Sequence, residues 1–187
     1  MWDGHIARIN YLPAWLRHPA WYKNQARCLY LEAEVGLKIL GTDAQQAVPE
    51  LLSIYKRTFS LDSEQAMDSQ VLISRALVDI GPSATSWLLR WANSSNEFEN
   101  VLAVCTLSQI HAQPSVVVPV LVRCLGHTNA QIRIGAAEGL GNFGDEARQA
   151  VPALVQALTD PSKPMRSKVR QALKRIDPSA MDGSGVN

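Results

Sequence analysis

The sequence repeats itself with a period of about 33 residues, and this period limits the possible folds more than any other feature. Segment 41–51 aligns without a gap with segment 144–154, and segments 81–91 and 111–121 fit the same frame. The turn at the start of each unit falls at positions 41, 81, 111, 144 and 177, so successive turns differ by 40, 30, 33 and 33 in sequence number. A unit this short cannot bury a core alone, so the period predicts stacking against neighbouring units.

The residues before each turn predict a long α-helix. Counted back from the turn, apolar or small residues stand at positions −8, −5, −4 and −1, which form one stripe of a helix. Position −4 is always leucine: Leu37, Leu77, Leu107, Leu140 and Leu173. Position −5 is always small: Gly36, Ala76, Thr106, Gly139 and Ala172. We expect the small residue to admit a neighbouring helix and the leucine to fill the space beside it.

A shorter helix is expected after each turn. Pro49, Pro119 and Pro152 follow a valine at the same place, and proline is tolerated in the first turn of a helix because its missing N–H would have no partner there. A polar break then precedes the long helix, as in segments 125–129 and 158–161. Each unit therefore reads as helix, turn, helix, and the chain is predicted to be all-α.

We expect one domain over residues 1–180, a right-handed α-solenoid of about five helix-turn-helix repeats. The repeats are predicted at residues 41–80, 81–110, 111–143 and 144–177, after an atypical N-terminal cap repeat at 1–40. Residues 181–187 are expected to form a disordered tail.

The clearest units resemble a known family. The segment Arg133-Ile-Gly-Ala-Ala-Glu-Gly-Leu-Gly-Asn-Phe-Gly144, followed by Asp-Glu-Ala-Arg-Gln-Ala-Val-Pro152, resembles the HEAT repeat in the short bacterial form associated with phycobilisome lyases. The resemblance covers about residues 12–180. It implies an α-solenoid whose second helices line a concave face that holds partner proteins. Lyase activity belongs to only a few proteins that carry the motif, so a bilin lyase-like protein or chaperone is an alternative function.

Composition limits the partners. The 18 basic and 17 acidic side chains leave a formal charge of +1, so a polyanion would need a local patch. Cys28, Cys105 and Cys124 show no CxxC spacing, which fits a reducing compartment. We see neither a signal peptide nor an apolar run of membrane-spanning length, and we expect a cytoplasmic protein by default.

No catalytic, cofactor or metal site is predicted. Residues 139–144 satisfy the GxGxxG pattern, but a dinucleotide site needs a strand before the glycines, and here they are expected to end a helix. None of the histidines, His5, His18, His111 and His127, stands in an HExxH motif, and no nucleophile can be paired with a base from spacing. We expect a protein without enzymatic activity, with the lyase-like function as the alternative.

Polar residues at positions −6 and −2 of the long helices are the candidate partner-binding surface. They are Arg75, Asp79, Gln109, Glu138, Asn142, Gln171 and Arg175. Their mixed charge suits a protein surface better than a phosphate backbone, which favours a row of Arg and Lys. The identity of the partner and the oligomeric state are open.

A second candidate surface lies on the last long helix. Arg166, Arg170 and Lys174 are spaced i, i+4, i+8 and project on one side of that helix. This basic ridge is either a polyanion site, which gives nucleic-acid binding as a second alternative function, or a solvated face of an end helix.

Two segments depart from the repeat. Half of the twelve aromatic residues are Trp2, Tyr11, Trp15, Trp21, Tyr22 and Tyr30, and they indicate a packed cap or a patch at a protein interface. Residues 56–70 are an insertion, which we expect to lengthen the loop between two helices. Whether that insertion is functional is left open.

Overall fold

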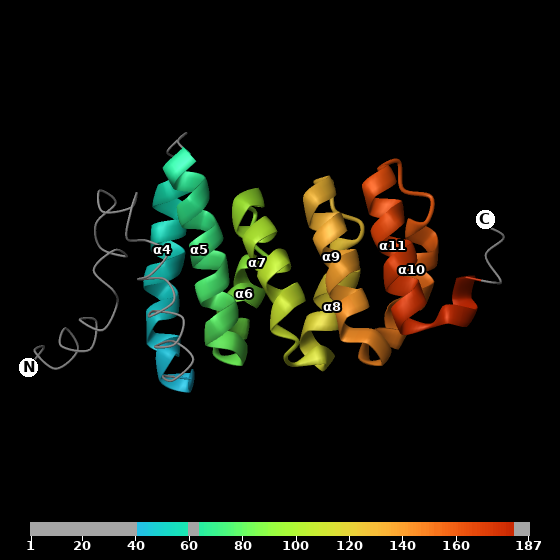
Figure 1. Cartoon of the computed structure of the whole chain (residues 1–187), viewed down its shortest axis with the longest axis horizontal. Helices are drawn as coiled ribbons and strands as arrows, with labels where there is room; N and C mark the ends of the chain where they lie inside the picture. The colour runs from blue at the N-terminus through green and yellow to red at the C-terminus, as the bar shows by residue number, and fades with distance from the viewer. Residues whose placement is uncertain (1–40, 60–63, 182–187) are drawn as a thin grey trace, which may run out of the picture. The chain divides into compact units, whose positions relative to one another are not determined.

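The computed structural model of the chain describes residues 41–59 and 64–181 (Figure 1). Every regular element in these residues is a helix, which confirms the all-α prediction. The chain divides into two compact units, with the boundary between Ala84 and Thr85. We call them unit 1 and unit 2 and describe each by itself.

The described residues of unit 1 form one pair of packed helices. The 3-10 segment η2 (Gly41–Ala47) leads into α4 (Val48–Phe59), and α5 (Glu64–Ile80) packs along α4 before the 3-10 turn η3 (Gly81–Ala84). The core between the two helices is apolar and includes Leu51, Tyr55, Ile73, Leu77 and Ile80, each at most 6% exposed. Val48 and Pro49 begin α4, as the Val-Pro pattern predicts.

The insertion at 56–70 was predicted to lengthen a loop, and this prediction is wrong. Residues 56–59 belong to α4 and residues 64–70 to α5, so most of the inserted residues extend the two helices. The segment holds no glycine or proline, so the helical structure on both sides of residues 60–63 meets no strong helix breaker. Residues 60–63 lie outside the described part.

Unit 2 contains three helix pairs: α6 with α7, α8 with α9, and α10 with α11 (Figure 1). Helix α9 packs against both α7 and α11, so these three long helices lie side by side in the order α7, α9, α11. The elements are α6 (Thr85–Trp91), α7 (Glu97–Ile110), α8 (Pro114–Cys124), α9 (Ala130–Phe143), η4 (Gly144–Ala150), α10 (Val151–Ala157), α11 (Lys163–Ile176) and η5 (Pro178–Met181).

The predicted apolar stripe is buried in all four long helices that the structure describes. In α9 it consists of Ala136, Gly139, Leu140 and Phe143, none more than slightly exposed. Across α5, α7, α9 and α11, only Ile110 is half-buried rather than buried. The stripe spacing therefore identified the core face of each helix correctly.

One prediction about the short helices is wrong. Pro119 was expected in the first turn, yet α8 starts at Pro114 and holds Pro119 in its interior. The turn before α8 holds two non-glycine residues with left-handed backbone conformations, His111 (φ 49°) and Gln113 (φ 52°). Pro114 then occupies the first turn of the helix, where its missing N–H costs nothing.

Glycines let the long helices of unit 2 approach closely. A Cβ atom at Gly139 would lie 2.8 Å from Ser108 Cβ on α7 and 2.9 Å from Leu121 Cδ1 on α8. A Cβ at Gly141 would lie 2.9 Å from the Cα atom of Ala172 on α11. The expectation that a small residue at position −5 admits a neighbour is thus met at Gly139 and Ala172.

Some predictions fall on residues outside the described part. These are the cap repeat at 1–40 with its six aromatic residues, and all but Met181 of the tail. The boundaries given above for the repeats stay predictions.

The glycine contacts give the first test. We expect Gly141→Ala to lower the free energy of unfolding by about 1 to 2 kcal/mol, because overpacking costs about 1 to 3 kcal/mol and the gain in helix propensity is at most about 1. The contacted atom is backbone, so no side-chain rotation relieves the clash. Urea denaturation followed by circular dichroism measures the change.

Gly126→Ala is the matched control, because its Cβ would meet only Arg123 O at an ordinary 3.8 Å. We expect that variant to stay within about 0.5 kcal/mol of the wild type. Equal stability of the two variants would contradict close α9–α11 packing.

Candidate functional site

The loop between the two helices of each pair in unit 2 has the same hydrogen-bonded form three times. The side chain at one position accepts from the backbone N–H two residues later, and that later residue caps the long helix. The three acceptors are Ser94 Oγ, His127 Nδ1 and Asp160 Oδ1, at 3.1, 3.0 and 2.8 Å. The caps are Asn96, Asn129 and Ser162, so each long helix starts from a fixed turn.

A side chain on each long helix ties down the same loop. Asn100 Nδ2, Arg133 Nη1 and Arg166 Nη1 each donate to the carbonyl six residues earlier, at 2.6, 2.8 and 2.6 Å. These three residues are one repeat period apart and hold one register position. Arg166 was predicted as part of the basic ridge, but the loop contact that it shares with Asn100 and Arg133 was not predicted.

Arg133 also joins two successive repeats. Its Nε lies 2.8 Å from Asp160 Oδ2 and its Nη2 lies 3.2 Å from Asp160 Oδ1, a bidentate ion pair. The side chains are only 13% and 10% exposed. Burial acts to raise the pKa of Asp160, but the hydrogen bonds from Arg133 and Ser162 N, with the charges of Arg133 and Arg166, hold it below the ordinary value.

The predicted partner-binding residues of unit 2 lie along α7, α9 and α11, and we call this surface the second-helix face. Glu138, Gln109, Gln171 and Arg175 are exposed there, and Asn142 is half-buried. Arg75 is exposed and Asp79 half-buried on α5, and these two belong to unit 1.

Polar contacts join neighbouring helices across the second-helix face. Asn142 on α9 donates from Nδ2 to Ser108 O on α7 (2.9 Å) and accepts through Oδ1 from Arg175 Nη1 on α11 (2.8 Å). Lys168 Nζ on α11 pairs with Glu138 Oε1 on α9 at 3.0 Å. Asn142 and Arg175 were predicted for the surface, and the structure brings them together.

Gln109, also predicted for the surface, bonds within its own helix. Gln109 donates from Nε2 to Cys105 O of its own helix at 3.1 Å. Lys168 was not predicted as part of the surface. Lys168 stands 30 residues after Glu138, close to one repeat period, and this spacing could have indicated a contact between the two side chains.

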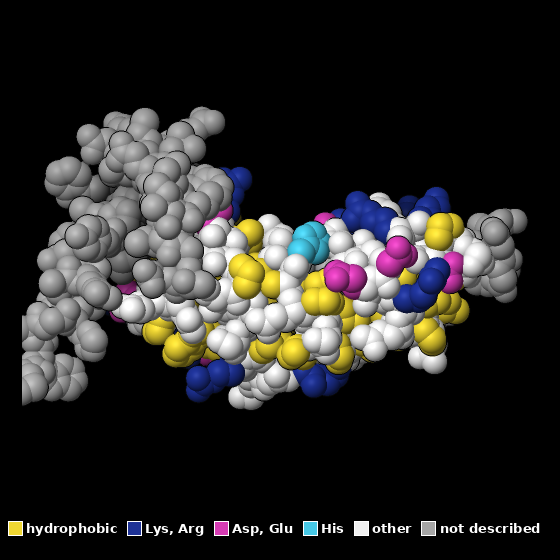
Figure 2. All heavy atoms as spheres, turned by 90° about the horizontal axis from the view of Figure 1, so that it is seen from below, with side chains coloured by type: hydrophobic (Ala, Val, Ile, Leu, Met, Phe, Trp, Pro, Cys, Tyr) yellow, Lys and Arg dark blue, Asp and Glu magenta, His cyan; other side chains and the backbone are white. Residues whose placement is uncertain are grey.

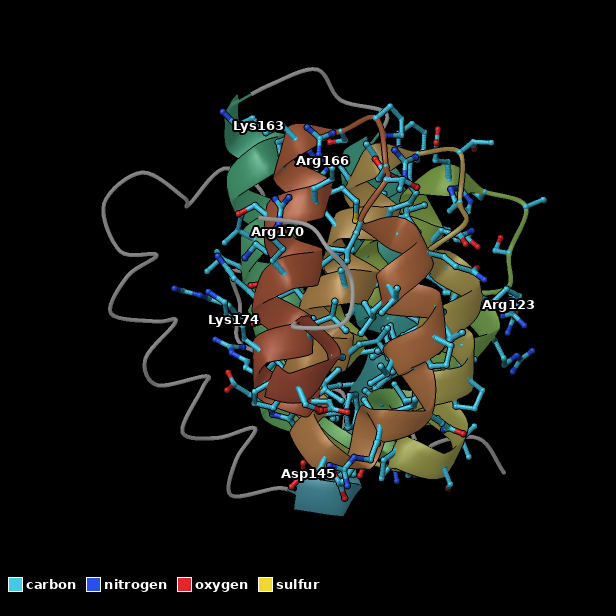
Figure 3. The ribbon with its side chains drawn as sticks, turned by 90° about the vertical axis from the view of Figure 1, so that its right-hand side faces the viewer. Arg123, Asp145, Lys163, Arg166, Arg170 and Lys174 are labelled. Atoms are coloured by element: carbon cyan, nitrogen blue, oxygen red, sulfur yellow. The ribbon has the colours of Figure 1, made fainter. Side chains whose placement is uncertain are left out.

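The basic ridge follows one side of α11. Figure 3 shows Arg166, Arg170 and Lys174 one after another along that helix, with Lys163 near its start. Lys174 is exposed, while Arg166 and Arg170 are half-buried. The structure thus places the three predicted residues in one row.

Charges elsewhere in unit 2 are mixed. Figure 2 views the chain from below, and over unit 2, at its right-hand side, basic, acidic and hydrophobic side chains are interspersed. The described residues hold no group of three or more metal-ligating side chains. No helix among them has the length and apolar character needed to cross a membrane.

The described cysteines show no sign of activation. Burial raises the pKa of Cys105, and the charge of Glu138 raises it further. Burial also raises the pKa of Cys124, against the opposing charge of Arg123. A raised pKa keeps a thiol protonated at neutral pH and so less nucleophilic.

Helix pairs that stack side by side with a regular sequence period define an α-solenoid. A family model described as HEAT repeats matches residues 85–174, so this segment of the chain carries HEAT repeats. HEAT repeats commonly serve as scaffolds for protein interaction.

A search of solved structures agrees on the fold. A crystal structure of an engineered protein aligns with a TM-score of 0.50 at 19% identity, over 87% of this chain and 81% of that chain. This likeness supports the fold alone. No curated protein matches the sequence.

The Arg133–Asp160 pair gives a test that depends on pH. Because folding lowers the pKa of Asp160 below its ordinary 3.8, its stabilising effect is complete above about pH 5 and is lost as pH falls through the lower, folded value. We expect Asp160→Asn to lower the free energy of unfolding by about 2 kcal/mol at pH 7. The difference from the wild type should shrink below pH 4.

Urea denaturation at pH 7 and at pH 3 measures both values. Asp145→Asn is the control, because Asp145 is an exposed carboxylate and its loss should cost less than about 0.5 kcal/mol at either pH. A difference for Asp160→Asn that stays constant with pH would show that its charge does not stabilise the fold.

Proposed function

We propose that the chain is a non-enzymatic scaffold that binds a partner protein on the second-helix face. The observation that carries the proposal is the cross-linking of this face by Asn142, which bonds to both neighbouring helices. Exposed side chains on three adjacent helices are thereby held at fixed spacings before a partner arrives. A surface ordered in advance loses less conformational entropy on binding.

The charges on the second-helix face favour a protein partner. Glu138 and Lys168 balance each other, while Gln109 and Gln171 are exposed and neutral. A phosphate backbone is bound mainly by Lys and Arg, and carboxylates in the contact area repel it. A mixture of charged and amide side chains fits the polar rim of a protein interface.

Two further predictions belong to this function. Arg75 and Asp79 on α5 are included as partner-binding residues of unit 1. A cytoplasmic location is also part of it. The bilin lyase-like or chaperone alternative rests on the family resemblance, and no described residue favours it.

Site-specific photo-crosslinking tests the proposal. We expect a photoreactive phenylalanine analogue placed at Gln109, Glu138 or Gln171 to give a discrete covalent adduct in cells, because these exposed side chains would contact the partner. The same analogue at Ser115 on α8 or Gln156 on α10, both exposed on first helices, is the matched control.

Gel shifts before and after protease or nuclease treatment identify the adduct as protein. Circular dichroism confirms that each variant keeps its helices. Adducts formed equally from Ser115 and Gln156, or adducts sensitive to nuclease, would contradict the proposal.

A further inference from the structure

The basic ridge occupies a side of the helix that is covered by the next helix in the preceding repeats. On α7 this side includes Val104 and Ser108, which lie against Gly135 and Gly139 of α9: a Cβ at those glycines would approach them to 3.3 and 2.8 Å. On α9 it includes Gly141, which lies against Ala172 of α11. On both α7 and α9, the side that corresponds to the ridge therefore contacts the next repeat.

On α11 the same side is cationic. Arg170 stands one repeat period after Ala137, which is fully buried, and Lys174 stands one repeat period after Gly141. Neither cation forms an ion pair with any residue in the described ranges 41–59 and 64–181. Like charges spaced i, i+4 repel each other, and no described residue forms an ion pair with Arg170 or Lys174 that would offset this repulsion.

Arg166 is held in the pose in which Arg133 binds a carboxylate. Arg166 Nη1 donates to Asp160 O and Pro161 O at 2.6 and 3.1 Å, as Arg133 Nη1 donates to His127 O and Thr128 O. Arg133 uses its Nε and Nη2 for Asp160. The Nε and Nη2 of Arg166 form no hydrogen bond with a described residue, so the edge that holds Asp160 in Arg133 is available in Arg166.

We propose that this side of α11 binds an acidic helix of a partner protein. One carboxylate of that helix occupies at Arg166 the place that Asp160 occupies at Arg133. Acidic residues spaced i, i+4, i+8 on the partner match the three cations, because both helices share the same rise per residue. The inference rests on the proposed protein-binding function and names a second surface for it.

Charge and length favour an acidic helix over a nucleic acid. The ridge runs from Arg166 to Lys174, a rise of about 12 Å along the helix, which matches roughly two turns of a partner helix. Three cations give a polynucleotide only about three phosphate contacts, which is too few for tight binding at physiological salt.

Anisotropy titration of the full chain with a labelled peptide tests the inference. The probe is an alanine-based helical peptide about 16 residues long, or roughly four turns, with glutamate at i, i+4 and i+8, and its glutamine analogue is the reference peptide. We expect the glutamate peptide to bind, and the variant with Arg166→Gln, Arg170→Gln and Lys174→Gln to bind it about 10-fold more weakly or worse. Binding of the glutamine peptide with equal affinity would overturn the inference.

A second triple variant is the matched control. Arg90→Gln, Arg123→Gln and Arg148→Gln removes the same charge from exposed arginines elsewhere on unit 2. We expect less than about a 2-fold loss of peptide affinity, because separated surface charges act only weakly at moderate salt. An equal loss in both triple variants would mean that only net charge matters.

Arg166→Lys separates the bidentate edge of Arg166 from simple charge. Lysine keeps the charge but cannot present two parallel N–H groups, so we expect about a 3-fold or greater loss of affinity. Unchanged affinity would overturn the role given to Arg166. Circular dichroism of each variant excludes misfolding as the cause.

Two further titrations settle the occupant. The first uses an oligothymidylate of about 15 nucleotides, which is within the usual range of single-strand site sizes. If it binds more tightly than the glutamate peptide and loses the same affinity in the ridge variant, the occupant is a nucleic acid and not an acidic helix. A gain of about 10-fold in peptide affinity when residues 182–187 are removed would assign the ridge to the chain's own terminus. Adducts at Gln109 or Glu138 without peptide binding would leave the scaffold proposal standing and reject this inference alone.

Discussion

The structure of unit 2 depends on how closely α9 approaches its two neighbours. Gly139 meets Ser108 and Gly141 meets the backbone of Ala172 at distances that leave no room for a side chain. At this separation the larger apolar residues of the stripe, such as Leu140 and Leu173, are fully buried between the pairs. Because each pair has too few residues for a core of its own, stability comes from this contact between repeats.

Close approach also fixes the register, and the register makes the polar contacts between repeats possible. Arg133 reaches Asp160, and Asn142 reaches both Ser108 O and Arg175, only when α9 sits at one height against its neighbours. A shift by one residue would turn these side chains away and leave nearly buried charged groups without partners, which is costly. The apolar stripe thus brings the helices together, and the polar contacts select one alignment.

The sequence predicted the repeated part of the fold and little of what joins one repeat to the next. The leucines at position −4 predicted the buried face of each long helix, because apolar residues recur with the helix period and this period is visible in a single sequence. Pro119 misled the prediction, since proline is acceptable both in a first turn and, at some cost, inside a helix. Helix α8 starts at Pro114, directly after the positive φ angles of His111 and Gln113. Partners such as Asp160 were missed because contacts between repeats depend on the distance between helices.

One register position shows how a repeat acquires a specific property. Asn100, Arg133 and Arg166 all tie down their own loop through the carbonyl six residues earlier. Asn100 bonds only to carbonyls of its own repeat among the described residues, whereas the longer Arg133 holds the loop and also binds the carboxylate of the next repeat. The shared contact maintains the fold, and the length and charge beyond it are free to vary among repeats. Functional differences in such an array therefore lie at positions where repeats differ while their common hydrogen bond is kept.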